Sequence, residues 1–175
     1  MRRTIIAILL ALALAVIPAA NAFAAKTATV TVTATGGHLS IAISGGTDGN
    51  GAVPFGVVIE SDNVSTATDN ITLTNNGTVA ADITIQGASS TGAGTNWTLA
   101  DDGVPGGDIY GLEFSRDAAP AWTVIKRTAA VTYLNNLLVG APNADKFGLL
   151  LSTPTTITDT TNVRTMVVTL TAARH

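Results

Sequence analysis

The sequence between residues 70 and 85 reads Asn70-Ile71-Thr72-Leu73-Thr74-Asn75-Asn76-Gly77-Thr78-Val79-Ala80-Ala81-Asp82-Ile83-Thr84-Ile85. Apolar and polar residues alternate on both sides of Asn75-Asn76-Gly77, which is the period of a strand with one buried face. Asn and Gly both tolerate the positive φ of a tight turn between antiparallel strands. The stretch therefore predicts a β-hairpin that joins two strands of one sheet.

The same alternation recurs along most of the chain. Its clearest example is Thr27-Ala28-Thr29-Val30-Thr31-Val32-Thr33-Ala34-Thr35, with threonine on one face and alanine or valine on the other. Residues 131–139 fit a short helical turn as well as a strand. Glycine, asparagine and proline separate the runs, so we expect about eight to ten short strands. The remaining runs are Leu39 to Ile43, Val53 to Val58, Trp97 to Leu99, Tyr110 to Phe114, Trp122 to Val124, Phe147 to Leu151 and Met166 to Leu170.

Composition favours the same fold class. Threonine and valine are abundant, and their branched side chains fit a pleated sheet better than a helix. No window combines an amphipathic helical period with helix caps. We therefore predict an all-β protein with a single Ig-like or jelly-roll β-sandwich, preceded by a signal peptide.

The signal peptide is expected from the first residues of the chain. Arg2 and Arg3 precede an apolar run from Ile5 to Ile17, and small residues follow that run. This is the order of a secretory signal, with a cleavage box at Ala20-Asn21-Ala22 or Ala22-Phe23-Ala24. The run is shorter than the roughly 20 apolar residues of a membrane-spanning helix.

We therefore assign residues 1–24 to the signal peptide and residues 25–175 to one sandwich domain that is secreted or displayed at the cell surface. The chain has 9 Lys and Arg against 12 Asp and Glu, a net charge of −3, and cleavage removes Arg2 and Arg3. A sparsely charged acidic protein is a poor partner for nucleic acid and, once the signal is cleaved, for a membrane. It has no cysteine, so burial and sheet hydrogen bonds must stabilise it without disulfides.

Residues with catalytic or metal-binding chemistry do not form a recognisable set. His38 and His175 are the two histidines, and neither has the sequence neighbours of a catalytic triad or a zinc site. Four aspartates in turns carry oxygen ligands that calcium prefers, but such residues are also ordinary turn formers. A hydrolytic pair among Asp101, Asp102 and Glu113 lacks the expected placement. We predict no enzymatic activity, no catalytic or metal-binding residue and no cofactor. The four turn aspartates are Asp48, Asp101, Asp102 and Asp108.

Three aromatic residues support two different interpretations. Trp97, Tyr110 and Trp122 could together form a flat platform that stacks on sugar rings. Each of them lies in an alternating run, however, and a buried aromatic ring is the usual filler of a sandwich core. We favour the core for all three, and keep the platform as the alternative.

Several stretches resemble known families. Residues 69–85 resemble a hairpin of Ig-like domains in prokaryotic surface proteins, and residues 147–154 through 167–172 are similar to the last strands of secreted proteins of that kind. The order of leader, β-rich start and single sandwich is similar to that of TasA/camelysin-like matrix fibre subunits. Trp97-Thr98-Leu99 is similar to the motif of WxL cell-wall-binding domains, whose second copy is only approximated by Trp122-Thr123-Val124. These resemblances imply a sandwich with a structural or wall-binding role outside the cell.

We therefore expect an exported, non-enzymatic structural or surface-assembly subunit of a matrix, a filament or a cell surface. The alternative is a module that binds cell-wall or other polysaccharide. Thr27–Thr35 is the segment through which the protein could self-associate, because it contains no proline and has only Lys26 as a neighbouring charge. A strand without such protection can pair with a neighbouring subunit. Pairing within its own sandwich, as the first strand, is the alternative, and from the sequence we favour it.

Overall fold

Burial alternates along the strands of the structure, a computed structural model that describes residues 37–46 and 49–175. In β4 (Ala81–Gly87), for example, Ala81, Ile83 and Ile85 are buried and the residues between them are half-buried. The described residues form ten strands, one short 3-10 turn, η1 (Ala141–Asn143), and no α-helix. The all-β prediction is confirmed. The predicted signal peptide, the strand Thr27–Thr35 and Asp48 lie outside the described residues.

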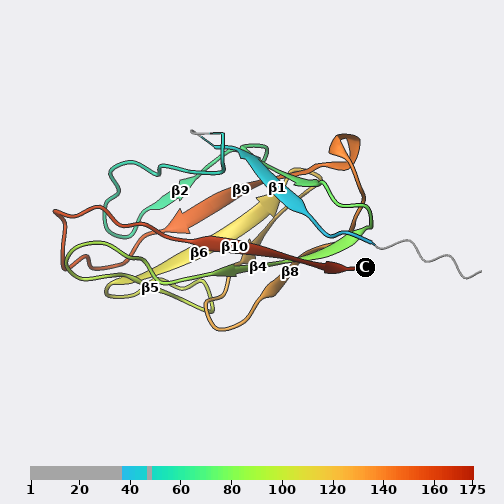
Figure 1. Cartoon of the computed structure of the whole chain (residues 1–175). Helices are drawn as coiled ribbons and strands as arrows, with labels where there is room; N and C mark the ends of the chain where they lie inside the picture. Colours follow the sequence, from blue (N-terminus) through green and yellow to red (C-terminus); the bar gives the residue numbers. More distant parts are fainter. Residues whose placement is uncertain (1–36, 47–48) are drawn as a thin grey trace, which may run out of the picture. The chain divides into compact units, whose positions relative to one another are not determined.

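The strands form two sheets (Figure 1). The larger sheet is strongly curled and has seven strands. Its main path follows β1 (Ile41–Gly45), β3 (Ile71–Asn75), β9 (Asp145–Ser152), β6 (Ile109–Arg116) and β5 (Thr98–Leu99). Two further strands extend it, because β2 (Asn63–Ser65) pairs with β9 and β7 (Ala119–Val124) pairs with β6. The smaller sheet has the order β10 (Val168–Arg174), β4 and β8 (Val131–Leu137). The β5–β6 pair is parallel and the other strand pairs are antiparallel.

The hairpin predicted for residues 70–85 is wrong. β3 and β4 flank the Asn75-Asn76-Gly77 turn, yet they belong to different sheets: β3 pairs with β1 and β9, and β4 pairs with β10 and β8. The chain therefore crosses from one sheet to the other at this turn. We call this crossing, residues 75–80, the arch.

The side chain of Asn75 explains why an arch forms. Its Nδ2 donates to the carbonyl oxygens of Val79 and Leu137, both at 2.9 Å, and its Oδ1 accepts the N–H of Gly77. The buried amide of Asn75, the last residue of β3 in the larger sheet, thus binds the main chain of the arch and of β8 in the smaller sheet. Gly77 serves close approach rather than a positive φ, because an added Cβ would lie 2.3 Å from the carbonyl oxygen of His38.

A polar network lies next to the arch. The carboxylate of Asp145 accepts two hydrogen bonds from Arg116, both at 2.8 Å, and a third from the hydroxyl of Tyr133. The Arg116 guanidinium also lies 5.6 Å from the centroid of the Tyr133 ring. Burial, together with the hydrogen bond to Asp145, raises the pKa of Tyr133 above its ordinary value. We call Asn75, Arg116, Tyr133 and Asp145 the arch end.

One hydrophobic core is shared by the two sheets. Trp97 and Tyr110 are buried in it, as predicted, with ring centroids 6.5 Å apart. The prediction of burial is wrong for Trp122, which is 40% exposed, because its strand β7 lies at an edge of the larger sheet and exposes most of its side chains. Residues 131–137, left ambiguous by the sequence, form strand β8. Within the described ranges, no helix has the length and apolar character needed to cross a membrane.

Candidate binding groove

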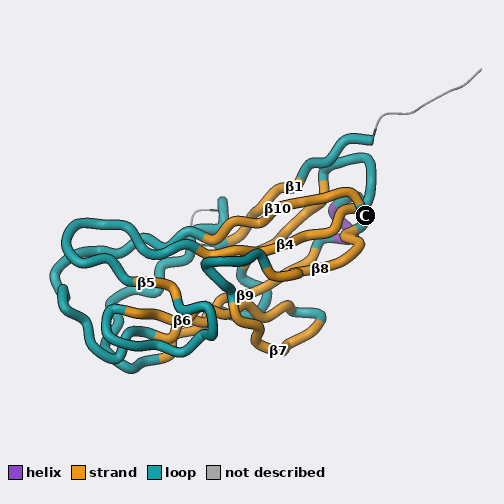
Figure 2. The backbone as a smooth tube through the Cα atoms, turned by 90° about the horizontal axis from the view of Figure 1, so that it is seen from below, coloured by secondary structure: helices purple, strands orange, loops and turns teal. Residues whose placement is uncertain are grey.

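The two sheets do not pair with each other along one side of the core. β1 is an edge strand of the larger sheet and β10 is an edge strand of the smaller one, and within the described residues each pairs with one neighbour. β1 and β10 lie side by side in both views (Figures 1 and 2). Among the described residues, neither strand has a second strand paired to it on this side, although Gly45 at the end of β1 forms a single bridge with Asn50. An additional strand could hydrogen-bond to such an edge.

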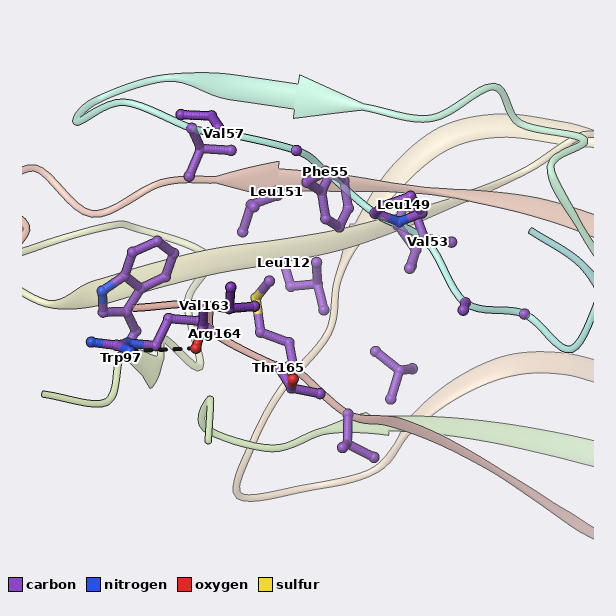
Figure 3. Close-up of a pocket in the computed structure, with 18 of the residues that line it drawn as sticks. Val53, Phe55, Val57, Trp97, Leu112, Leu149, Leu151, Val163, Arg164 and Thr165 are labelled. Atoms are coloured by element: carbon purple, nitrogen blue, oxygen red, sulfur yellow. Dashed lines mark hydrogen bonds between the residues drawn. The ribbon is translucent and has the colours of Figure 1, made fainter. Parts of the chain in front are cut away.

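A long apolar groove lies on this side, with a volume of about 1030 Å³. Residues 50–58 form one wall, and residues 159–168 together with Leu170 form the other. Figure 3 shows side chains from both walls and from β6 and β9 pointing into the space between them. This volume is at the upper end of ordinary ligand pockets. Five core residues form the floor: Ile71, Leu112, Phe147, Leu149 and Leu151.

The first wall comes from a segment that the sequence predicted as a strand. Residues 53–58 alternate in the sequence but form no strand in the structure. Pro54 lacks the N–H that a ladder needs, and Gly56 has a φ of 75°, so the segment cannot continue a regular ladder. The residue that follows the segment, Ile59, is held by Thr153, whose hydroxyl donates to the Ile59 carbonyl oxygen at 2.6 Å.

Exposed apolar side chains surround the groove. Val57 is 99% exposed and Val163 is 85% exposed, and they lie on opposite walls. Val167 and Ile43, which also line the groove, are exposed large apolar residues too. A contiguous apolar surface around a cleft is typical of a site that another molecule covers. We call these four residues the apolar rim.

Two buried polar atoms at one end of the groove have no hydrogen-bond partner. They are Nε1 of Trp97 and Nε of Arg164, each exposing less than 1 Å² to solvent. The Trp97 residue is 5% exposed and the Arg164 side chain 3%. An unpaired buried donor costs about 1–3 kcal/mol. The described residues contain one more such atom, Oγ of Ser115, and Ser115 does not line the groove. We call Trp97 and Arg164 the donor end of the groove.

Short hydrogen bonds hold both donors in place. Ser90 accepts the backbone N–H of Trp97 at 2.7 Å through its hydroxyl and donates its own N–H to the Trp97 carbonyl oxygen. The Arg164 guanidinium donates to the carbonyl oxygen of Ala93 and, at 2.8 Å, to the carboxylate of Asp159. The segment 90–93 therefore binds both residues, and Figure 3 shows their side chains close together at one end of the groove.

The charge of Arg164 is balanced inside the site. The carboxyl of Asp159 has a pKa well below its usual range, because Asn162, Arg164 and Thr161 donate hydrogen bonds to it. The carboxylate is therefore ionised beside the guanidinium, and the donor end contains one paired charge of each sign. What the site still offers are two unpaired N–H donors, with no net charge, at the end of an apolar channel.

The residues weighed from the sequence as catalytic or metal-binding groups lie elsewhere. Asp101 accepts the backbone N–H groups of Arg127 and Thr128, and Asp108 accepts that of Thr158, so both carboxylates hold loops together. These hydrogen bonds lower the pKa of both carboxyls. In the part of the chain that the structure describes, no three His, Cys, Asp or Glu side chains are grouped for a metal ion.

The two histidines are also separate from the groove. His38 is exposed, and its backbone N–H donates to the hydroxyl of Thr78 beside the arch. The ring Nδ1 of His175 lies 2.6 Å from the carboxylate of Asp82. Neither residue lines the groove.

Comparison with protein-family models, with curated proteins and with solved structures finds no match for this chain. The groove is therefore interpreted from its own geometry.

Sequence reasoning missed the groove and its donor end. One signal was available, because Arg164 is the one basic residue between Lys146 and Arg174 in a long Thr- and Val-rich stretch. A lone basic residue in such a stretch, with Asp159 as its one acidic neighbour, suggests a special environment. The walls themselves have no sequence signature, because they are made of loop residues brought together from distant parts of the chain.

Proposed function

We propose that this protein is an exported, non-enzymatic structural subunit that assembles with copies of itself in an extracellular matrix or filament or at the cell surface. In this proposal its two sheets are an Ig-like or jelly-roll sandwich whose described part contains no strand on the groove side. The observation that carries the proposal is the apolar groove with its exposed rim, between β1 and β10, two strands that each lack a second paired strand among the described residues. A free-standing domain normally covers such a surface.

The proposed occupant is the segment Thr27–Thr35 of a second copy. Its alternation presents Ala28, Val30, Val32 and Ala34 on one face, which matches an apolar floor, and leaves threonine hydroxyls for solvent. Nine extended residues span about 30 Å. Main-chain hydrogen bonds to a free edge would supply affinity, and the alternating side chains would supply specificity.

The path of the described chain is compatible with exchange between copies. Residues 38–40 are held against the arch, where Ser40 accepts the N–H groups of Asn76 and Gly77 and His38 accepts that of Thr78. The segment before them joins the domain beside the arch. It can therefore enter a neighbour's groove without breaking these hydrogen bonds.

Polysaccharide binding is less well supported. The sugar-stacking interpretation needs a platform of Trp97, Tyr110 and Trp122, and the first two rings are buried in the core. Trp122 remains as a single exposed ring on an edge strand. Retention on polysaccharide is therefore an outcome of the experiment below rather than a second proposal.

The test compares particle size for three forms of the mature protein: residues 25–175, a form without residues 25–35, and the double rim variant Val57→Asp/Val163→Asp. Sedimentation and electron microscopy should detect assemblies of the first form. The other two should be folded monomers by circular dichroism, because one lacks the donor segment and the other has a charged rim.

Two results would overturn the proposal. A wild-type protein that stays monomeric at every concentration would refute assembly. An unfolded product after deletion of residues 25–35 would place the segment in its own domain. Monomers that are retarded on a polysaccharide column would instead favour the binding module.

A further inference from the structure

We propose that the donor end of the groove recognises main-chain carbonyl oxygens of the inserted segment and so sets where that segment stops. This inference rests on the proposed function, because it names the chemistry by which the same groove holds its occupant. It assigns a specific role to Trp97 and Arg164, the two groove residues with unpaired buried N–H groups.

The chemistry of the donor end selects the type of ligand. The indole Nε1 and the guanidinium Nε can each donate a hydrogen bond but cannot accept one. The missing partners are therefore acceptors. The rest of the groove is apolar along its floor, so an acceptor must arrive as part of a largely apolar molecule that lies along the channel.

The charge balance favours a neutral acceptor over an anion. The Arg164 guanidinium already binds the Asp159 carboxylate at 2.8 Å, and that carboxylate also accepts a hydrogen bond from Asn162. A second carboxylate, as in a fatty acid, would meet repulsion from Asp159 without a free positive charge to compensate it. An amide carbonyl accepts hydrogen bonds and brings no charge.

An extended peptide supplies carbonyl oxygens in the required arrangement. Carbonyl oxygens repeat about every 7 Å along one edge of a strand. An inserted strand therefore presents acceptors along its whole length. β10 begins at Val168, after Arg164, so at the donor end side-chain donors can take over from the strand edge. Satisfying both N–H groups at one register would favour that register over slipped ones, which the repetitive alternation of Thr27–Thr35 does not distinguish by itself.

The loop beside the two donors is suited to admit the peptide. Residues 159–163 belong to no strand, and Val163 is exposed. Because neither unpaired nitrogen is reached by solvent, the inserted segment must displace this loop slightly as it reaches them.

The test uses the full mature chain with Val30→Asp and Val32→Asp, which disable its own segment, and adds a synthetic peptide of residues 26–37. In ¹H–¹⁵N spectra the Trp97 indole signal, identified by the Trp122→Phe variant, should move downfield as peptide saturates the groove. Trp97→Phe and Arg164→Lys, made in the same background, should each weaken peptide binding about tenfold, the value of one net hydrogen bond. Trp122→Phe should leave it unchanged.

The outcomes separate this inference from the proposed function. Peptide that binds equally well to Trp97→Phe and Arg164→Lys, with no movement of the Trp97 signal, would overturn the inference and leave assembly through the groove standing. A saturated long-chain carboxylate that moves the Trp97 signal and displaces the peptide would also overturn it, because the site would then prefer an anion. Peptide that does not bind at all would overturn both.

Discussion

The arch end and the donor end of the groove both bury polar atoms, but only the arch end provides all of those atoms with hydrogen-bond partners. At the arch end, buried polar atoms are paired: the Asn75 amide makes three hydrogen bonds, and the Asp145 carboxylate accepts three. At the donor end, Nε1 of Trp97 and Nε of Arg164 are equally buried and have no partner. The arch end is complete within one chain.

This difference locates the groove, and not the arch end, as the place where our proposal puts a second copy of the chain. A buried unpaired donor is costly, and such atoms are rare in native structures. Two of them lie at one end of an apolar groove with an exposed rim, where the proposed occupant would supply their acceptors. We therefore expect substitutions at the arch end to change the stability of the folded chain, and substitutions in the groove to change the proposed association.

The largest effect on stability is expected from Trp97→Ala. The ring belongs to the core, so its loss should lower the free energy of unfolding by about 3–5 kcal/mol, as measured by urea denaturation. Trp122→Ala is the matched control, because that ring is partly exposed on an edge strand, and it should cost about 0.5 kcal/mol or less. Unchanged stability of Trp97→Ala with lost polysaccharide retention would instead favour a sugar-binding site.

Breaking the network at the arch end should have the next largest effect. Asp145→Ala leaves the Arg116 guanidinium and the Tyr133 hydroxyl without their shared acceptor. Removal of one partner of a buried ion pair costs about 3 kcal/mol or more, and we expect the lower end because Arg116 is partly exposed. Asp69→Ala, an exposed carboxylate, is the control and should be nearly neutral. Equal unfolding midpoints for the two variants would contradict the role of the network.

Separate substitutions of the adjacent Asn75 and Asn76 distinguish an arch from a hairpin. Asn75→Ala should destabilise the protein by about 2 kcal/mol, because Val79, Leu137 and Gly77 each lose a buried partner. Asn76 is exposed, so Asn76→Ala should cost about 0.5 kcal/mol or less. A hairpin with an Asn76-Gly77 turn would give the reverse order in thermal or chemical unfolding.

The smallest effect is expected in the acid dependence of Tm, through Asp159 at the donor end. Hydrogen bonds from Asn162 and Arg164 lower the pKa of Asp159, so its ionised form is favoured in the folded state. Its contribution is complete above the ordinary carboxyl pKa of about 4 and declines as pH falls toward the lowered value. Between pH 6 and pH 2, Tm should therefore fall more steeply for the wild type than for Asp159→Asn. Parallel curves would mean that Asp159 is not held as the structure has it.

The strands were largely predictable because side-chain alternation is a local property. Ile71 and Leu73, or Phe147, Leu149 and Leu151, indicate a half-buried strand wherever it pairs. The partners of each strand were less predictable. Asn75-Asn76-Gly77 has the local chemistry of a hairpin turn, and a buried amide that reaches Leu137, 62 positions away, turned it into an arch. Trp122 lies in an alternating run as Trp97 does, but an edge position left it exposed.

The amino-acid sequence by itself determined the all-β character of this protein and the position of most of its strands, because the period of alternation and the β-branched composition act within a few residues. Only the tertiary structure decided which strands share a sheet, that Val53–Val58 becomes a wall rather than a strand, and that Trp97 and Arg164 lie at the same end of a groove. These features depend on contacts between residues far apart in the chain. No local pattern specifies such contacts, because the same alternating run can satisfy its backbone against several different neighbours.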